Sequence, residues 1–146
     1  MKRIFRKLHP SKETRVYNKM HRRHRRELIN HAKETREWDW GYLHDSIIMQ
    51  IRHMHEYYTA GNNVMQSDDS NKIIIDQLSH VLDLAKEIED IADEDLGCEI
   101  SLEDGKIKCI YPEDYEKKFK ELAEREHNLY KELYSYIGEY IRWWWD

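Results

Sequence analysis

The clearest helical signal in this chain is residues 40–59, WGYLHDSIIMQIRHMHEYYT. Its large apolar residues recur every three or four positions, which places them on one side of a helix. They are Trp40, Leu43, Ile47, Ile51 (or Gln50), Met54 and Tyr58. Asp39 is suited to cap the start, and Gly61-Asn62-Asn63 to end the helix, because Gly and Asn tolerate the left-handed conformation that follows a helix. The stretch predicts an amphipathic helix with one buried face.

Two further stretches on either side have the same helical period. One runs from Ser11 to about Glu34, and its thin stripe of Val16, Tyr17, Met20, His24, Leu28 and Ala32 needs a partner to be stable. The other begins near Ser70, ends before Gly97 and has a strongly acidic outer face. Its inner face consists of Ile74, Leu78, Val81, Leu82, Ala85, Ile88 and Ala92.

The last predicted helix, from about Glu113 to Trp143, approaches a strict heptad. Its core positions are Tyr115, Phe119, Leu122, Glu126, Leu129, Leu133, Tyr136, Tyr140 and Trp144. At 1.5 Å per residue it is about 45 Å long, more than a domain of this size covers. We therefore expect part of it to pack on a second subunit.

Between residues 98 and 111 the apolar period changes from 3.6 to 2. Asp104-Gly105 separates the two alternating runs, which is a strong signal for a β-hairpin. A lone hairpin is marginal in water, so we expect it to lie against the helices or to pair with another copy. Cys98 and Cys109 are interpreted as free thiols in the core of this hairpin.

The fold class predicted is mainly α, a bundle of about four helices with this small hairpin. Residues 1–10 form a basic N-terminal arm and residues 11–146 a single helical domain. No apolar run approaches the roughly 18–20 residues of a membrane span, and the N-terminus lacks a secretory apolar segment. The expectation is a soluble homo-oligomer.

The five tryptophans occur in two places, Trp38/Trp40 and Trp143-Trp144-Trp145. Burying a Trp stabilises by roughly 1.5–3 kcal/mol or more, so a terminal cluster of three should find a surface to cover. We expect the two clusters to meet, within or between subunits.

Charge is distributed unevenly along the chain. Residues 1–36 contain 13 Lys and Arg against 3 Asp and Glu, whereas the remainder has a net charge of −15. The run Met20-His21-Arg22-Arg23-His24-Arg25-Arg26 puts positive charge around most of a helix, which suits phosphate contacts. Docking of this segment on the acidic body of the protein is the alternative.

A polar seam, Asp45, Met49, Arg52 and Glu56, follows one side of the predicted helix 40–59. It could orient a polar ligand beside the aromatic residues, or it could be an ordinary row of salt bridges.

No motif in the chain names a reaction. There is no Gly-rich phosphate loop, nucleophile elbow or zinc-type cysteine pattern. A di-iron bundle needs two Glu-x-x-His motifs, and only Glu124-x-x-His127 is present. Glu34-x-x-Glu37 and Glu87-x-x-Asp90 have the spacing of helical Mg²⁺-dependent nucleotide pyrophosphatases, although such pairs are common in acidic chains. We expect no catalytic residue, metal or cofactor, with the pyrophosphatase as a weaker alternative.

Two pieces carry a resemblance. The opening Trp38-Asp39-Trp40-Gly41-Tyr42-Leu43-x-Asp45, with Arg52-x-Met54-x-x-Tyr57, and the ending Trp144-Trp145-Asp146 resemble a group of small helical proteins encoded by tailed bacteriophages. The resemblance implies a phage protein in the host bacterial cytoplasm. Some small phage proteins act as anti-defence sponges that sequester immune nucleotide messengers.

The predicted function is therefore non-enzymatic sequestration of a small anionic nucleotide. In this hypothesis phosphates meet Arg22, Arg23, Arg25, Arg26 and Arg52; the base stacks on Trp38, Trp40 and Tyr42; and Asp45 and Glu56 accept hydrogen bonds. The alternative is an interaction module whose basic helix docks on nucleic acid or on an acidic host protein.

Overall fold

The computed structural model describes residues 12–34, 40–60, 68–103 and 105–144, apart from the side chains of Glu13, Glu34 and Asp68. The chain divides into two compact units, Met1–Leu78 and Ser79–Asp146.

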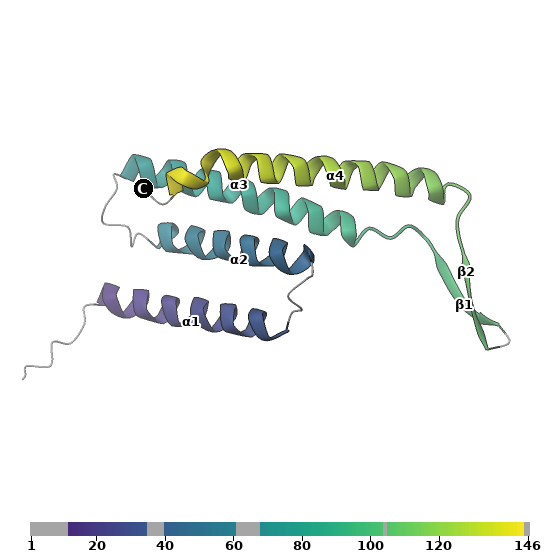
Figure 1. Ribbon diagram of the computed structural model, residues 1–146, viewed down its shortest axis with the longest axis horizontal. Coiled ribbons are helices and arrows are strands. Elements are labelled where there is room, and N and C mark those ends of the chain that lie inside the picture. The colour runs from purple at the N-terminus through teal and green to yellow at the C-terminus, as the bar shows by residue number, and fades with distance from the viewer. Residues whose placement is uncertain (1–11, 35–39, 61–67, 104, 145–146) are drawn as a thin grey trace, which may run out of the picture. The chain divides into compact units, whose positions relative to one another are not determined.

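Within the described residues the fold is mainly α, as the sequence predicts (Figure 1). The helices are α1 (Lys12–Glu34), α2 (Trp40–Thr59), α3 (Asp68–Ala92) and α4 (Tyr115–Tyr140). A short 3₁₀ turn, η1 (Ile141–Trp144), continues α4 to the end of the described chain. The predicted caps Ser11 and Asp39, and the stop signal at residues 61–63, lie outside the described residues. No described helix has both the length and the apolar character that crossing a membrane requires.

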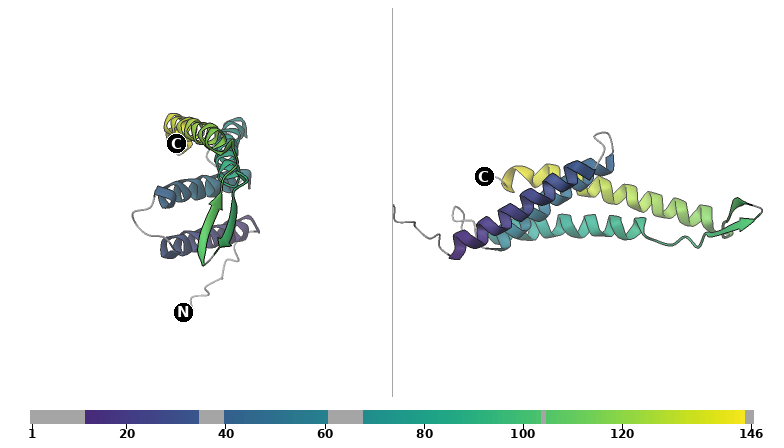
Figure 2. Two further views of the ribbon diagram at one scale, coloured as in Figure 1. Left: turned by 90° about the vertical axis from the view of Figure 1, so that its right-hand side faces the viewer. Right: turned by 90° about the horizontal axis from the view of Figure 1, so that it is seen from below.

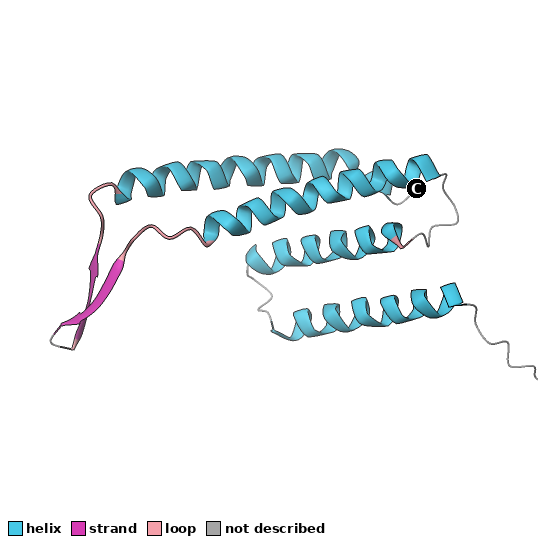
Figure 3. Ribbon diagram, turned by 180° about the vertical axis from the view of Figure 1, so that it is seen from behind, coloured by secondary structure: helices cyan, strands magenta, loops and turns pink. Residues whose placement is uncertain are grey.

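The β-hairpin also forms where the sequence predicts it. Strands β1 (Glu99–Glu103) and β2 (Lys106–Ile110) pair antiparallel, with Glu103 opposite Lys106 next to the turn. Gly105 has φ +72°, a conformation that glycine adopts without a Cβ penalty. The expectation that the hairpin lies against the helices is wrong, because it extends beyond the neighbouring ends of α3 and α4 (Figure 3). Cys98 and Cys109 are exposed free thiols rather than core residues.

In the first unit, α1 and α2 lie side by side (Figures 1 and 2). The buried apolar residues of this unit are Ile48, Ile51, Tyr58, Ile74 and Leu78. The predicted inner face of α2 is partly wrong, because Trp40 and Leu43 are 56% and 52% exposed. His44 and His53 are buried instead, so the buried side of the helix includes polar residues that hydrophobicity alone does not mark.

In the second unit, α4 runs beside the residues of α3 that follow Ser79 (Figure 3). Arg125 forms an ion pair of 2.6 Å with Glu87, and the rings of His80 and Tyr136 meet at 4.6 Å. The buried residues of this unit are Val81, Leu84, Ala85, Ile88, Ile91, Leu129, Leu133, Ile137 and Trp144. The predicted heptad is confirmed at Leu129 and Leu133.

The same heptad is wrong at Phe119, which is 54% exposed, whereas Tyr115 and Leu122 are half-buried. Farther along, Ile137 takes the buried position predicted for the adjacent Tyr136. Trp144 is 1% exposed and so finds the cover expected for it, whereas Trp143 is 68% exposed. The sequence predicts that the two tryptophan clusters meet. Two of their members, Trp38 and Trp145, lie outside the described residues.

Candidate functional site

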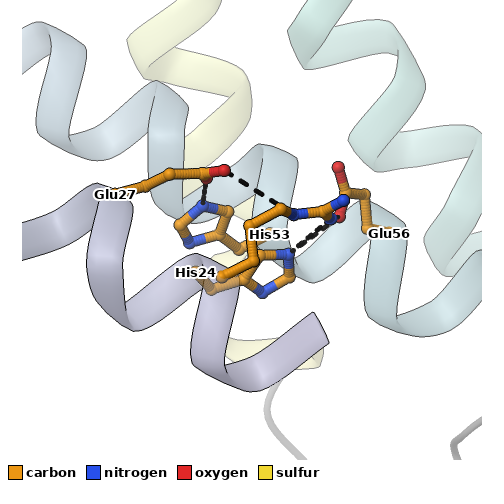
Figure 4. A network of polar contacts seen from close by, with 5 residues as sticks. His24, Glu27, His53 and Glu56 are labelled. Carbon is orange, nitrogen blue, oxygen red and sulfur yellow. Dashed lines mark hydrogen bonds and ion pairs between the residues drawn. The ribbon is translucent and has the colours of Figure 1, made fainter. Parts of the chain in front are cut away.

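Histidines and carboxylates, rather than aliphatic side chains, form the centre of the α1–α2 contact. His24 and Glu27 come from α1, and His53 and Glu56 from α2; we call these four residues the His–Glu cluster (Figure 4). His24 and His53 are 9% and 7% exposed, so both imidazoles are buried although histidine is a polar residue. Buried imidazoles need hydrogen-bond partners, and the two carboxylates supply them.

The cluster is reciprocal. His24 Nε2 lies 2.8 Å from Glu56 Oε2, and His53 Nε2 lies 2.7 Å from Glu27 Oε2. The two imidazole rings stack, with centroids 3.8 Å apart and planes at 5°. The histidine of each helix thus contacts the glutamate of the other helix. On each helix the glutamate follows the histidine by three residues.

Arg23 brings one positive charge to the two carboxylates of the cluster. Its Nη2 donates to Glu56 Oε2, and its Nε lies 3.6 Å from Glu27 Oε1. Because Arg23 and His24 share the same acceptor oxygen, the 3.2 Å between Arg23 Nη2 and His24 Nε2 separates two donors. The Nε2–H tautomer of His24 fits this arrangement.

Burial is the main influence on the protonation of His53. It lowers the pKa of His53 below its ordinary 6.5; the hydrogen bond to Glu27 opposes this shift, and the charge of His24 adds to it. The hydrogen bond from His53 in turn lowers the pKa of Glu27 below its ordinary 4.5. At neutral pH a neutral His53 therefore donates its Nε2–H to an ionised Glu27.

Aromatic contacts flank the cluster at both ends of the helix pair. On one side Tyr17 stacks on His21 at 6.0 Å and meets the edge of Tyr57. On the other side His31 stacks on Tyr42 with centroids 4.8 Å apart. These contacts extend a polar and aromatic interface along α1 and α2.

Ser46 fixes the tautomer of His31. The Ser46 hydroxyl donates to the carbonyl of Tyr42 at 2.7 Å, so it accepts from His31 Nε2, which lies 3.0 Å away. This hydrogen bond holds the ring against Tyr42, a residue that the sequence assigned to ligand binding.

The other side of α1 is cationic. An open hollow of about 570 Å³ runs along the helix, lined by Arg15, Asn18, Lys19, Arg22, Arg23 and Arg26. We call these six residues the basic face. Their spacing of three and four positions places them on one side of the helix, roughly opposite His24, Glu27 and His31. Among the described residues, Arg22 and Arg26 have no ion-pair partner.

The residues predicted to bind a ligand lie in several different places and do not form one site in the described part of the chain. Arg22, Arg23 and Arg26 line the same hollow, and Arg23 also reaches Glu56. Arg25, Asp45 and Arg52 are exposed elsewhere on α1 and α2. Trp40 is exposed at the start of α2, Tyr42 stacks on His31, and Trp38 lies outside the described residues. In the described part of the chain, the residues that line the hollow include no aromatic side chain.

Sequence reasoning did not identify His24, Glu27 and His53 as a unit with Glu56. A signal for them exists, because the motif His-x-x-Glu occurs at His24–Glu27 and again at His53–Glu56, at helical spacing. Two such motifs on antiparallel helices can satisfy each other's donors and acceptors. This order is the reverse of the Glu-x-x-His motif of di-iron bundles.

The acidic pairs considered for Mg²⁺ do not gather into a metal site in the part of the chain that the structure describes. No group of three or more His, Cys, Asp or Glu side chains converges there as metal ligands. Glu87 forms its ion pair with Arg125, while Glu37 and the side chain of Glu34 lie outside the described residues.

Comparison of the chain with family models, with curated proteins and with solved structures found no match.

Proposed function

We propose that this chain is a non-enzymatic binding protein for phosphate-bearing ligands and that the phosphates bind to the basic face of α1. The supporting observation is the line of five cationic side chains along one side of one helix. The line runs from Arg15 to Arg26, about 16 Å at 1.5 Å per residue. Five charges over this length are about 4 Å apart on average, close to the rise of about 3.4 Å per phosphate along one strand of a duplex.

An extended nucleic-acid backbone is the ligand that suits this surface best. Among the described residues, the hollow is lined by five cations and Asn18, and none of these side chains is apolar or aromatic. Such a surface offers charge and hydrogen-bond donors but, among its described residues, no aromatic ring on which a base can stack. Contacts of this kind hold phosphates without reading sequence.

Sequestration of a small nucleotide is the second candidate. The volume of the hollow, about 570 Å³, falls in the range of about 300–1,000 Å³ that small-molecule sites occupy. In this proposal the chain is a bacteriophage protein that holds an immune nucleotide messenger in the host cytoplasm. The base would then need an aromatic surface from outside the hollow, such as the exposed Trp40.

Salt-dependent binding tests the proposal. Fluorescence anisotropy of labelled oligonucleotides is measured at several salt concentrations. For five phosphate contacts, the slope of log affinity against log salt should be about −4.5 for duplexes and about −3.5 for single strands. Arg22→Gln/Arg26→Gln should weaken binding and reduce the slope by about 2. The matched control, Lys117→Gln/Lys120→Gln on α4, removes the same charge and should leave both unchanged.

A nucleotide panel separates the two candidates. The protein is incubated with cyclic and ADP-ribose-type nucleotides, washed and heated, and the released material is identified by mass spectrometry. Recovery of one intact nucleotide, without oligonucleotide binding, supports sequestration; recovery of cleaved products contradicts a non-enzymatic role. If neither oligonucleotides nor nucleotides bind, or if the Arg22/Arg26 variant binds as well as the wild type, the proposal is wrong.

A further inference from the structure

The β-hairpin has an apolar face. In its register Ile100 lies opposite Cys109 and Leu102 lies opposite Ile107. Side chains that pair across two strands point to the same side, and alternate residues point to the other side. These four residues therefore share one face, which has no charged side chain.

This apolar face is open to solvent. Ile100, Leu102 and Ile107 are 75%, 74% and 73% exposed. Single exposed aliphatic residues are ordinary on protein surfaces, but three neighbours on one face of two paired strands form a contiguous patch. Such a hairpin, alone in water, is marginally stable, because it buries little apolar surface.

The patch continues from the hairpin onto α4. Tyr111 directly follows β2, two positions after Cys109, and therefore continues the side of the strand on which Cys109 lies. The ring of Tyr111 meets Tyr115 at 4.7 Å, and Tyr115 stacks on Phe119 at 5.9 Å. Tyr111 and Phe119 are 57% and 54% exposed. With a free surface of about 200 Å² per side chain, the patch exposes on the order of 600 Å².

The opposite face of the hairpin carries its charges, and they are balanced within it. Lys108 Nζ lies 3.2 Å from Glu103 Oε2, and Glu103 also stands opposite Lys106. The apolar patch therefore has no charge for which a partner must compensate. A charged partner surface would lose its hydration here without gaining an ion pair.

We propose that the apolar face of the hairpin, with the aromatic row on α4, is the surface through which two copies of this chain associate. A second copy presents an uncharged apolar face of the same size. Two patches of about 600 Å² bury about 1,200 Å² together, the lower bound of a specific interface. The association gives the hairpin the cover that its own unit does not provide, and it is independent of anion binding by α1.

Charge substitution on the apolar face tests this proposal with the full chain. Sedimentation velocity over a range from low to high micromolar should show a dimer for the wild type. Ile107→Lys and Ile107→Glu should each weaken dimerisation by at least about tenfold, because like charges meet in an apolar contact. The controls Glu99→Gln and Lys106→Gln make the same net charge changes on the opposite face and should remain dimeric.

Mixing the two variants makes the test independent of folding. The apolar face measures only about 7 Å by 5 Å between its outer Cα atoms, so position 107 of one copy lies close to position 107 of the other. Lys on one copy and Glu on the other should therefore attract each other. An equimolar mixture of Ile107→Lys and Ile107→Glu should therefore sediment as a dimer. A wild-type chain that stays monomeric, charged variants that still dimerise, or a mixture that stays monomeric each overturn the proposal.

Discussion

His24 and His53 lie face to face between α1 and α2, with ring centroids 3.8 Å apart. Each is held there by the glutamate of the opposite helix, so a polar contact occupies the place where helix pairs ordinarily bury Leu or Ile. A stack of two imidazoles is stable while the rings are neutral and is weakened when both carry a proton. The helix pair is consequently sensitive to pH.

The first prediction concerns that sensitivity. The pKa of His53 is lowered in the folded chain, so the unfolded state takes up a proton first as pH falls through 6.5. Stability present above this pH is therefore lost on acidification, and the lowered pKa of Glu27 extends the loss below pH 4.5. Chemical denaturation between pH 8 and pH 5 should show a falling midpoint for the wild type.

His53→Gln is the variant for this measurement, because its amide can still donate to Glu27 but does not titrate. It should be less stable at pH 8, by about 1 kcal/mol, and show a flatter pH profile. Identical pH profiles for the two proteins would show that His53 does not govern the acid response.

The second prediction concerns Glu56, which accepts from both His24 and Arg23. Glu56→Gln should lower the free energy of unfolding by about 1 kcal/mol, a modest loss because the side chain of Glu56 is 38% exposed. It should also raise the affinity for an oligonucleotide about two- to fivefold, because Arg23 no longer has an anionic partner in the protein.

The control for this variant is Glu121→Gln, which removes the exposed partner of Lys117 at 3.8 Å. It should change neither stability nor affinity. If Glu56→Gln weakens oligonucleotide binding together with stability, Arg23 acts only within the helix pair.

The third prediction contrasts two adjacent tryptophans. Trp144 is 1% exposed, so Trp144→Ala should destabilise by about 3–5 kcal/mol. Trp143 is 68% exposed, and Trp143→Ala should cost less than about 1 kcal/mol. Thermal unfolding followed by circular dichroism measures both, and equal effects would show that burial at position 144 is not what stabilises this end.

The fourth prediction contrasts two glycines. Gly105 has φ +72°, so Gly105→Ala should destabilise the hairpin by about 1 kcal/mol, although a Cβ there meets nothing within 4 Å. Gly138 lies inside α4, where an added Cβ also meets nothing within 4 Å. Gly138→Ala should stabilise by about 0.5–1 kcal/mol through helix propensity alone. Hydrogen exchange of β1 and β2 amides and the midpoint of thermal unfolding separate the two effects.

The elements themselves could be predicted because their signals are local. The period of 3.6 locates the four helices, and Asp104-Gly105 between alternating runs locates the hairpin. The buried face of α2 could not be predicted in the same way. Which side is buried depends on the partner, and here the partner buries His53, a residue that a hydrophobic pattern counts as exposed.

In α4, likewise, the heptad pattern does not tell which of its apolar residues are buried. Periodic apolar residues indicate where a partner can bind, and Leu129 and Leu133 are buried accordingly. Phe119 follows the period equally well but is exposed. At the candidate site, the arginines of one helix could be grouped from sequence, whereas the pairing of Glu27 with His53 depends on how two helices meet.

The reciprocal His-x-x-Glu arrangement also sets the axial alignment of α1 and α2. Sliding one helix along the other by a single turn, about 5.4 Å, would part His24 from Glu56 and His53 from Glu27 at the same moment. An aliphatic seam offers nearly equivalent contacts after such a slip, but two crossed donor–acceptor pairs do not. The two contacts are therefore made or lost together: both form when the helices are correctly aligned, and neither forms after a slip of one turn.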